Sequence, residues 1–204
     1  MKNFITFEGC EGVGKSTQIR YLKEYLQKTN QPALFTREPG GNEVGEKIRE
    51  ILLKEKMSAL CEAHLFAAAR IEHINTVILP ALNQGMLVIC DRYIDSSFAY
   101  QGFARGLGLE KVMQINEFAV NNCMPQYTVF LDMNPLNSWR KQKGKVIDDR
   151  MEGESGEFHL KVYDGFKRLS QAYADRYIVI EPKPLKEETS QSIIDALRKR
   201  GIIK

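Results

Sequence analysis

The chain has 204 residues, of which 43% are hydrophobic and 27% are charged. This composition can bury one substantial core, so we expect a single domain over residues 1–204. The net charge of +3 is mild, which gives no reason to expect nucleic acid as a partner, although it suits small polyanions. No apolar run in the sequence suggests a transmembrane helix, so we expect no membrane partner either.

Predicted strands and helices alternate along the chain. Strands are predicted at residues 3–7, 33–36, 86–90, 127–131 and 177–180. Helices are predicted at 15–29, around 44–52, from 60 to an interruption at Pro80, around 95–103, 109–120 and 158–173, and at about 186–199. Five strands joined by helical crossovers indicate an α/β fold with a parallel sheet and helices on both faces.

The loop between the first strand and the first helix has a phosphate-binding pattern. Residues 7–17 read Phe-Glu-Gly-Cys-Glu-Gly-Val-Gly-Lys-Ser-Thr, with Gly9, Gly14, Lys15 and Ser16 at the required spacing. Glycines permit the tight turn in which backbone N–H groups point at phosphate oxygens, and the helix dipole adds to the attraction. The pattern predicts a three-layer P-loop NTPase fold whose nucleotide-binding residues are Gly9, Cys10, Glu11, Gly12, Val13, Gly14, Lys15, Ser16 and Thr17.

Asp91 ends the apolar strand at residues 86–90. Because parallel strands end at one edge of the sheet, Asp91 should lie beside the phosphate-binding loop and the loop at residues 37–41. A carboxylate there can hold magnesium directly or through water, together with Ser16. Arg92 offers a planar fork suited to a second phosphate. The alternatives are a turn-forming Asp91 and an Arg92 in a surface ion pair.

The cysteines and the first residues favour a cytoplasmic protein. Cys10, Cys61, Cys90 and Cys123 form no Cys-x-x-Cys pair. Residues 1–3 lead directly into the first predicted strand, without the features of a signal peptide. The sequence therefore predicts reduced thiols.

Five stretches carry a resemblance to a known family. They are Phe-Glu-Gly-x-Glu-Gly-x-Gly-Lys at residues 7–15, Thr-Arg-Glu-Pro-Gly-Gly at 36–41, Leu-Phe-Ala-Ala-x-Arg at 65–70, Asp-Arg-Tyr-x-Asp-Ser-Ser-x-Ala-Tyr-Gln-Gly at 91–102 and Asp-Arg-x-Glu at 149–152. With them the chain resembles the bacterial thymidylate kinases over residues 4 to about 173. The first stretch alone indicates a nucleotide, whereas the combination is specific to this family.

The resemblance implies an ATP-dependent phosphotransferase that makes dTDP from dTMP with magnesium, a step in dTTP synthesis. Lys15 would hold the donor phosphates. Arg37, Arg49 and Arg92 would clamp the acceptor phosphate, since clustered guanidinium groups offset the repulsion between two polyanions. The family also implies a homodimer, in which the alanine-rich segment 67–69 could pack closely.

The resemblance further implies how the base is recognised. A lone Phe on a helix face is ordinarily core, so only the motif favours stacking of Phe66 on thymine. Arg70 is harder to explain as core, because a buried unpaired charge is costly. Arg70 would donate to a thymine carbonyl. The other substrate-binding residues implied are Glu38, Ser97, Tyr100 at the sugar, and Gln101.

The resemblance places additional catalytic charge in a short mobile lid at about residues 139–154. Family loops of this type carry an acid at Glu11 but no arginine, and they go with basic lids. The basic lid residues are Arg140, Lys141, Lys143, Lys145 and Arg150. Arg150 is the expected catalytic residue with Lys15, Glu11 and Arg92. Arg140, Lys143 and Lys145 stay open, and a lysine would lack the bidentate fork.

Two other functions compete with this interpretation. A GTP-binding switch would share the phosphate-binding loop, but the chain has no Asn-Lys-x-Asp guanine motif. A kinase for another deoxynucleotide or for a deoxynucleoside is the nearer alternative. Arg37, Arg49 and Arg92 favour an acceptor that already bears phosphate, while Phe66 and Arg70 favour thymine.

Overall fold

The computed structural model describes residues 1–137 and 150–204. Its centre is a five-stranded parallel sheet with the strand order β2-β3-β1-β4-β5. The strands are β1 (Phe4–Glu8), β2 (Ala33–Arg37), β3 (Leu87–Asp91), β4 (Tyr127–Leu131) and β5 (Tyr177–Ile180). The predicted fold class is confirmed, and each predicted strand agrees with an observed one to within one residue at either end.

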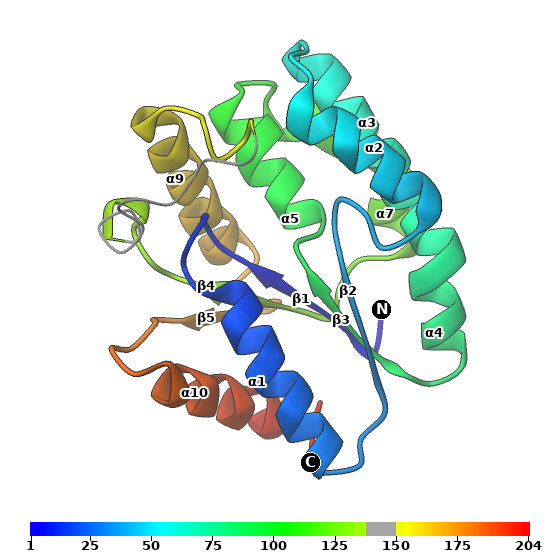
Figure 1. Ribbon diagram of the computed structural model, residues 1–204, viewed down its shortest axis with the longest axis vertical. Coiled ribbons are helices and arrows are strands. Elements are labelled where there is room, and N and C mark those ends of the chain that lie inside the picture. The colour runs from blue at the N-terminus through cyan, green and yellow to red at the C-terminus, as the bar shows by residue number, and fades with distance from the viewer. Residues whose placement is uncertain (138–149) are drawn as a thin grey trace.

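The central strands are buried because helices cover both faces of the sheet. All five residues of β1 are buried, and so are the first four of β3, as expected for near-continuous apolar runs in a parallel sheet. In Figure 1, α1 (Lys15–Lys28) and α10 (Lys186–Lys199) lie on one face. On the other face lie α5 (Ile94–Ser97), η2 (Phe98–Ala104) and α9 (Gly156–Ala172). The chain crosses between the two faces at β1, which places its loop at the switch point where ligands bind in such sheets.

Two further helices stand beyond the sheet edge. They are α2 (Glu43–Lys54) and α3 (Ala59–His73), which pack on each other. Asn42 caps α2 by accepting from the Gly45 N–H at 2.6 Å, and Ser58 caps α3 by accepting from the Cys61 N–H at 3.3 Å. These caps fix where both helices begin beside the carboxyl ends of β2 and β3.

The predicted interruption at Pro80 is wrong. After α3 the chain continues through a π-helical turn, η1 (Ile74–Ile78), into α4 (Leu79–Asn83). The Leu79 N–H donates to the Ile74 carbonyl, five residues back, so the turn is already widened where Pro80 enters and the proline is accommodated at the start of α4. Contrary to expectation, this 25-residue run is long and apolar enough to cross a membrane by length and composition alone, a test that core helices of soluble proteins also pass.

The predicted helix at 109–120 is two helices. Helix α6 (Leu109–Ile115) and helix α7 (Glu117–Asn122) meet at Asn116. The Asn116 side-chain NH2 donates to the Val112 carbonyl at 2.9 Å. This local hydrogen bond competes with the regular helical hydrogen bonds, as asparagine side chains commonly do. The side-chain oxygen, Asn116 Oδ1, stays available for another partner.

Candidate active site

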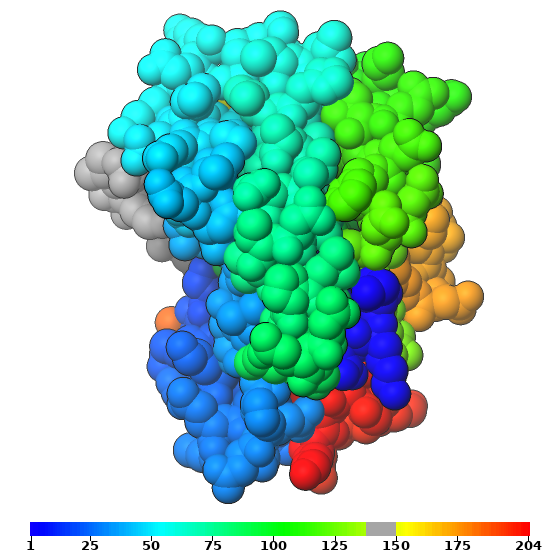
Figure 2. Space-filling view, turned by 90° about the vertical axis from the view of Figure 1, so that its right-hand side faces the viewer, coloured from blue at the N-terminus to red at the C-terminus, as the bar shows by residue number. Residues whose placement is uncertain are grey.

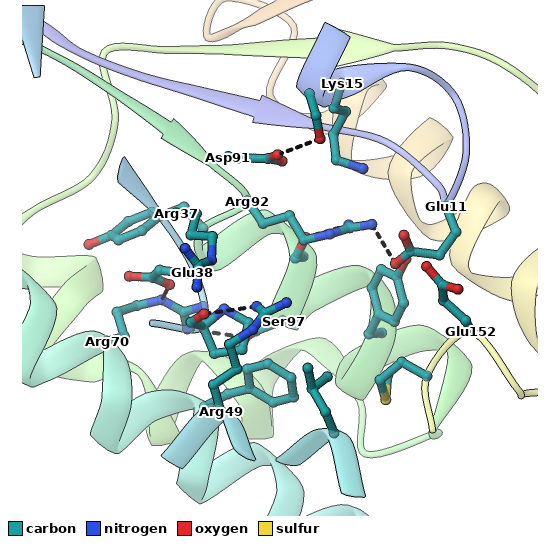
Figure 3. A pocket seen from close by; sticks show the side chains of 18 of the residues that line it. Glu11, Lys15, Arg37, Glu38, Arg49, Arg70, Asp91, Arg92, Ser97 and Glu152 are labelled. Atoms are coloured by element: carbon teal, nitrogen blue, oxygen red, sulfur yellow. Dashed lines mark hydrogen bonds and ion pairs between the residues drawn. The ribbon is translucent and has the colours of Figure 1, made fainter. Parts of the chain in front are cut away.

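A cavity of about 450 Å³ opens at the carboxyl ends of β1, β2 and β3. Figure 3 shows Lys15 and Asp91 at one end, Arg70 and Glu38 at the other, and Arg92 between them. The predicted residues that line it are Glu11, Gly12, Gly14, Lys15, Ser16, Thr17, Arg37, Glu38, Arg49, Phe66, Arg70, Asp91, Arg92, Ser97, Tyr100 and Gln101. The structure therefore brings together most of the predicted site residues.

The phosphate-binding loop has the conformation that its glycines predict. Gly9, Gly12 and Gly14 take φ values of 144°, 72° and 98°, in the region that favours glycine. A Cβ on Gly9 would also lie 3.0 Å from the Leu131 carbonyl oxygen. Cys10 and Val13 are buried beneath the loop rather than in the cavity wall, and burial raises the pKa of the Cys10 thiol to about 12.

Lys15 is folded back into this loop. Its ammonium donates to the carbonyl oxygens of Gly9 at 3.1 Å and Cys10 at 3.2 Å. Burial, followed by repulsion from Arg92, lowers the Lys15 pKa. An incoming anion would compete with the two carbonyls for a cation that is already poorly solvated, so Lys15 is well placed to bind a phosphate oxygen.

Ser16 and Asp91 offer oxygen ligands at the same end of the cavity. The Ser16 hydroxyl donates to Asp91 Oδ2 at 3.4 Å. The other oxygen, Oδ1, is buried and accepts no hydrogen bond from any residue in the described ranges. Among these residues there is no cluster of three or more metal-ligating side chains. The pair therefore fits Mg²⁺, which favours one or two protein oxygens and takes its remaining ligands from water and phosphates.

Glu11 and Arg92 form an ion pair in the middle of the cavity. Arg92 Nη2 lies 2.6 Å from Glu11 Oε1, which also accepts from the Tyr100 hydroxyl at 3.2 Å. Burial alone would raise the pKa of Glu11, but Arg92 and Lys15 outweigh it and hold this pKa at about 2. Glu11 is thus ionised at neutral pH and orients both the guanidinium and the phenol.

The backbone at Arg92 is strained, and hydrogen bonds to the buried Glu8 stabilise the turn that follows it. Its φ is 64°, which a residue with a side chain rarely adopts and which recurs at functional sites. Glu8, buried under the loop, accepts from the Tyr93 N–H at 2.8 Å and from the Ser96 hydroxyl at 2.6 Å. Burial first, then the nearby Asp95, raise the pKa of Glu8 to about 8. Glu8 thereby fixes the turn that directs Arg92 into the cavity.

Arg37 and Arg49 enter from the neighbouring loop and helix. Arg37 binds both oxygens of Glu46 at 2.9 and 2.8 Å, in an exposed pair. Arg49 donates to the Pro39 carbonyl at 2.9 Å. With Arg92 they surround one part of the cavity (Figure 3). Three guanidinium groups there can bind a phosphate that already carries negative charge.

Arg70 is held at the far end of the cavity by a buried network. Its Nε donates to Glu38 Oε2 at 2.7 Å, while Nη1 donates to the Ser97 hydroxyl at 3.1 Å and to Asn116 Oδ1 at 2.5 Å. The side chains of Arg70 and Glu38 are only 2% and 4% exposed. No described residue accepts a hydrogen bond from Nη2. Arg70 can therefore present a fixed donor to a ligand.

A second layer of side chains supports Glu38. Its other oxygen, Oε1, lies 3.0 Å from His73 Nδ1, and His73 Nε2 lies 2.7 Å from the Thr36 hydroxyl. The chain passes close to this imidazole at Gly41, where a Cβ would lie 2.6 Å from Nε2. Glu38 is thus fixed from two sides, so the direction of Arg70 is set by the fold before any ligand arrives.

The π-helical segment η2 brings Tyr100 and Gln101 to the cavity. The Arg105 N–H donates to the Tyr100 carbonyl, five residues back, at 2.8 Å. Wide turns of this kind often occur at functional sites, because they shift the side chains that follow out of ordinary helical register. Gln101 is 1% exposed, and its side-chain NH2 donates to Glu62 at 2.9 Å.

Arg150 lies outside the cavity wall. Its Nε and Nη2 donate to the Leu52 carbonyl at 3.2 and 3.0 Å, and Nη2 also pairs with Glu62 at 2.7 Å. In this structure the guanidinium is bound to α2 and α3, so its catalytic role stays a prediction. The other basic lid residues, Arg140, Lys141, Lys143 and Lys145, lie outside the described residues.

Several residues of the site were missed from the sequence. Glu8 and Glu152 stand inside quoted motifs, and Glu152 lines the cavity, so both could have been singled out. Glu62 is a charged residue in the largely apolar first half of α3, the same kind of signal that drew attention to Arg70. Asn116 and His73 gave no local signal, because their partners are 46 and 35 residues away in sequence.

Comparisons with known proteins agree with this geometry. The family model for thymidylate kinase matches residues 7–193. The chain belongs to the thymidylate kinase family. A thymidylate kinase from Caldanaerobacter subterraneus subsp. tengcongensis is 47% identical over 180 residues, which cover 87% of this chain and 86% of that protein. One from Finegoldia magna is 41% identical over 203 residues, covering 98% of this chain and all of that protein.

A solved structure agrees as well. The crystal structure of thymidylate kinase from Ehrlichia chaffeensis superposes with a TM-score of 0.79 at 33% identity, and it covers 96% of this chain and 97% of that one. The sheet and helices described here thus form the thymidylate kinase fold, and family membership makes the chain an ATP-dependent kinase.

Proposed function

We propose that the chain transfers the γ-phosphoryl group of ATP to the 5′-phosphate of dTMP, with Mg²⁺, and releases dTDP and ADP. The observation that carries this proposal is one cavity with a phosphate-binding loop at one end, three arginines at its side and a buried, oriented arginine at the other end. Family membership supports the same substrates. Transfer of this type needs alignment and charge neutralisation more than covalent catalysis.

The donor phosphates would bind at the loop. Loop residues and the amino end of α1 line the cavity, and a helix amino end attracts anions. Lys15 would exchange its two carbonyl partners for phosphate oxygens. Ser16 and Asp91 would hold Mg²⁺, which when bound neutralises charge on the β- and γ-phosphates. Lys15, Ser16 and Asp91 would therefore hold the γ-phosphoryl group of ATP at the loop end of the cavity.

The acceptor would lie along the rest of the cavity. Arg37, Arg49 and Arg92 would bind its phosphate, and the Glu11 carboxylate would keep Arg92 and Tyr100 in place at the sugar. Arg70 would donate to a thymine carbonyl. Holding both polyanions in line removes much of the entropic cost of their encounter.

A second, open cavity lies on the other side of the loop, at the carboxyl ends of β4 and β5. It is lined by Asp132, Asn134, Tyr163, Lys167 and Lys183, among others. Since the acceptor would fill the side next to β2 and β3, this cavity is the place we propose for the nucleoside half of ATP. Lys167 and Tyr163 bind Asp132 at 2.6 and 2.8 Å and would form its wall.

Substrate turnover tests the function directly. ADP formation should be strong with ATP, Mg²⁺ and dTMP, weak with dCMP, and weak with thymidine, which lacks the phosphate that the three arginines bind. Removal of the metal with EDTA should abolish turnover, and excess Mg²⁺ should restore it. Equal turnover with every acceptor, or ADP formation without any, would contradict the assignment of the arginines and of Arg70.

We also propose a homodimer formed through α3. The exposed residues of this helix and η1 carry almost no charge, and they are Leu60, Cys61, His64, Ala68, Ile71, Asn75 and Thr76. Figure 2 shows the run from α3 to α4 crossing that face of the molecule. Ala67 and Ala69 are buried within the subunit, so Ala68 alone of the expected alanine segment is available for close packing between copies.

The dimer is tested by light scattering coupled to size-exclusion chromatography. The wild type should elute with twice the mass of one chain, and Ala68→Arg should elute as a monomer, because a charge would be buried at the contact. Gln191→Arg, on the exposed side of α10, is the matched control and should stay dimeric. A monomeric wild type would refute the proposal.

We also propose a cytoplasmic location. All four cysteines have free thiols, which is the state that a reducing cytoplasm maintains.

A further inference from the structure

Glu62 is a buried carboxylate beside the base end of the cavity. It stands on α3, it is fully buried, and it does not line the cavity itself. Gln101 donates to its Oε1 at 2.9 Å. Arg105 and Arg150 bind its Oε2 at 3.2 and 2.7 Å, and Arg105 Nε also donates to Oε1 at 3.2 Å. One carboxylate therefore joins the amide expected to read the base to two arginines.

The charge state of Glu62 determines how Gln101 must be oriented. Burial by itself would raise the pKa of Glu62, but the hydrogen bonds from Gln101, Arg105 and Arg150 outweigh it and hold this pKa below its usual value. An ionised carboxylate can only accept hydrogen bonds. The side-chain amide of Gln101 could be placed in two orientations, and the ionised Glu62 favours the one with the NH2 group toward it.

This orientation decides which group Gln101 can offer to a ligand. Gln101 lines the cavity beside Arg70 and Ser97. With its NH2 turned to Glu62, Gln101 has its carbonyl oxygen on the opposite side of the amide, where it can act as an acceptor for a ligand. Thymine carries a donor, N3–H, next to its O4 carbonyl. Cytosine carries an acceptor at N3 and a donor at C4, so two acceptors would face each other.

We propose that Glu62 is a positioning residue that sets base selectivity, by holding Gln101 with its carbonyl oxygen toward the pyrimidine N3 position. This inference rests on the proposed acceptor, a thymidine monophosphate. Arg70 and Gln101 together then form a donor and an acceptor that match O4 and N3–H of thymine. A cytosine would meet two mismatches, and a site built to hydrogen-bond its substrate discriminates strongly when its polar groups are left unpaired.

The Glu62→Gln variant tests the idea. Because Arg150 Nη2 and Arg105 Nη2 both require an acceptor at the Oε2 position, the new amide should turn its oxygen to them and its NH2 to Gln101, with loss of the Arg105 Nε contact at the Oε1 position. Gln101 should then rotate and present its own NH2 to the cavity. We expect the ratio of kcat/KM for dTMP to kcat/KM for dCMP to fall at least about tenfold. Most of the change should come from a higher KM for dTMP.

Glu154→Gln is the matched control. Like Glu62, Glu154 accepts a hydrogen bond from Arg105, at 2.5 Å. Gln101, however, donates to Glu62 and not to Glu154. The control should keep the selectivity ratio within about twofold of the wild type. A second variant, Glu62→Asp, keeps the charge for the arginines but withdraws the carboxylate from Gln101. It should lower the ratio in the same direction, and it serves if the first variant does not fold.

The outcomes separate this inference from the proposed function. If the folded variants keep the wild-type ratio, or lose dTMP and dCMP turnover in equal proportion, Glu62 has only a structural role and the proposal is overturned. If the wild type itself does not phosphorylate dTMP, the proposed function fails first, before any variant is compared.

Discussion

Lys15→Met is expected to lower kcat by about 10²–10³-fold while leaving dTMP binding nearly intact. The Lys15 ammonium is the one cation in the loop sequence, and among the described residues its hydrogen-bond partners are the carbonyls of Gly9 and Cys10. Methionine has a similar length but no charge, so negative charge on the transferring phosphoryl group would lose a preorganised partner. The acceptor arginines lie elsewhere in the cavity and are unchanged.

Two measurements check this expectation. Steady-state ADP formation gives kcat and both KM values, and calorimetric titration with dTMP gives acceptor binding. Lys161→Met is the matched control, since Lys161 forms an exposed ion pair with Glu157 on α9 and such pairs contribute little. If the Lys15 variant retained more than a tenth of the wild-type kcat, the loop would be a phosphate anchor without a catalytic cation.

The elements that sequence predicted well are those determined by nearby residues. Strand β4 and helix α10 have the expected bounds, because their apolar periodicity and flanking turn residues are local signals. The phosphate-binding loop was fully predictable, since spacing fixes its conformation. Pro80 was misjudged because a proline normally ends a helix, whereas here the π-helical turn η1 directly before it accommodates the ring.

The parts of the site that sequence could not show depend on distant partners. Nothing near Asn116 indicates that it accepts from Arg70, and nothing near Leu52 indicates that its carbonyl binds Arg150. Arg70 itself was expected from a motif, but its hydrogen bonds to three polar neighbours were not. Long-range pairing of this kind is set by the tertiary fold, which local propensity does not encode.

Arg70→Met is expected to weaken both the protein and its substrate specificity. The substitution would leave the Glu38 carboxylate in a buried site with His73 as its remaining partner. Breaking a buried pair on one side costs about 3–5 kcal/mol in the free energy of unfolding. Loss of the base donor should also reduce kcat/KM for dTMP by about 10²-fold, because a site built around a hydrogen bond discriminates strongly when that bond is missing.

A second substitution separates the two effects. In the Arg70→Met and Glu38→Gln double variant the stranded charge is gone, so much of the lost stability should return, as urea unfolding would show. The kcat/KM for dTMP should stay low, since no donor has been restored. If stability and activity instead recovered together, Arg70 would act only by holding the fold, and recognition of the base would have to rest on Gln101 and Ser97. If neither recovered, the cost would come from the cavity left by the guanidinium rather than from the unpaired carboxylate.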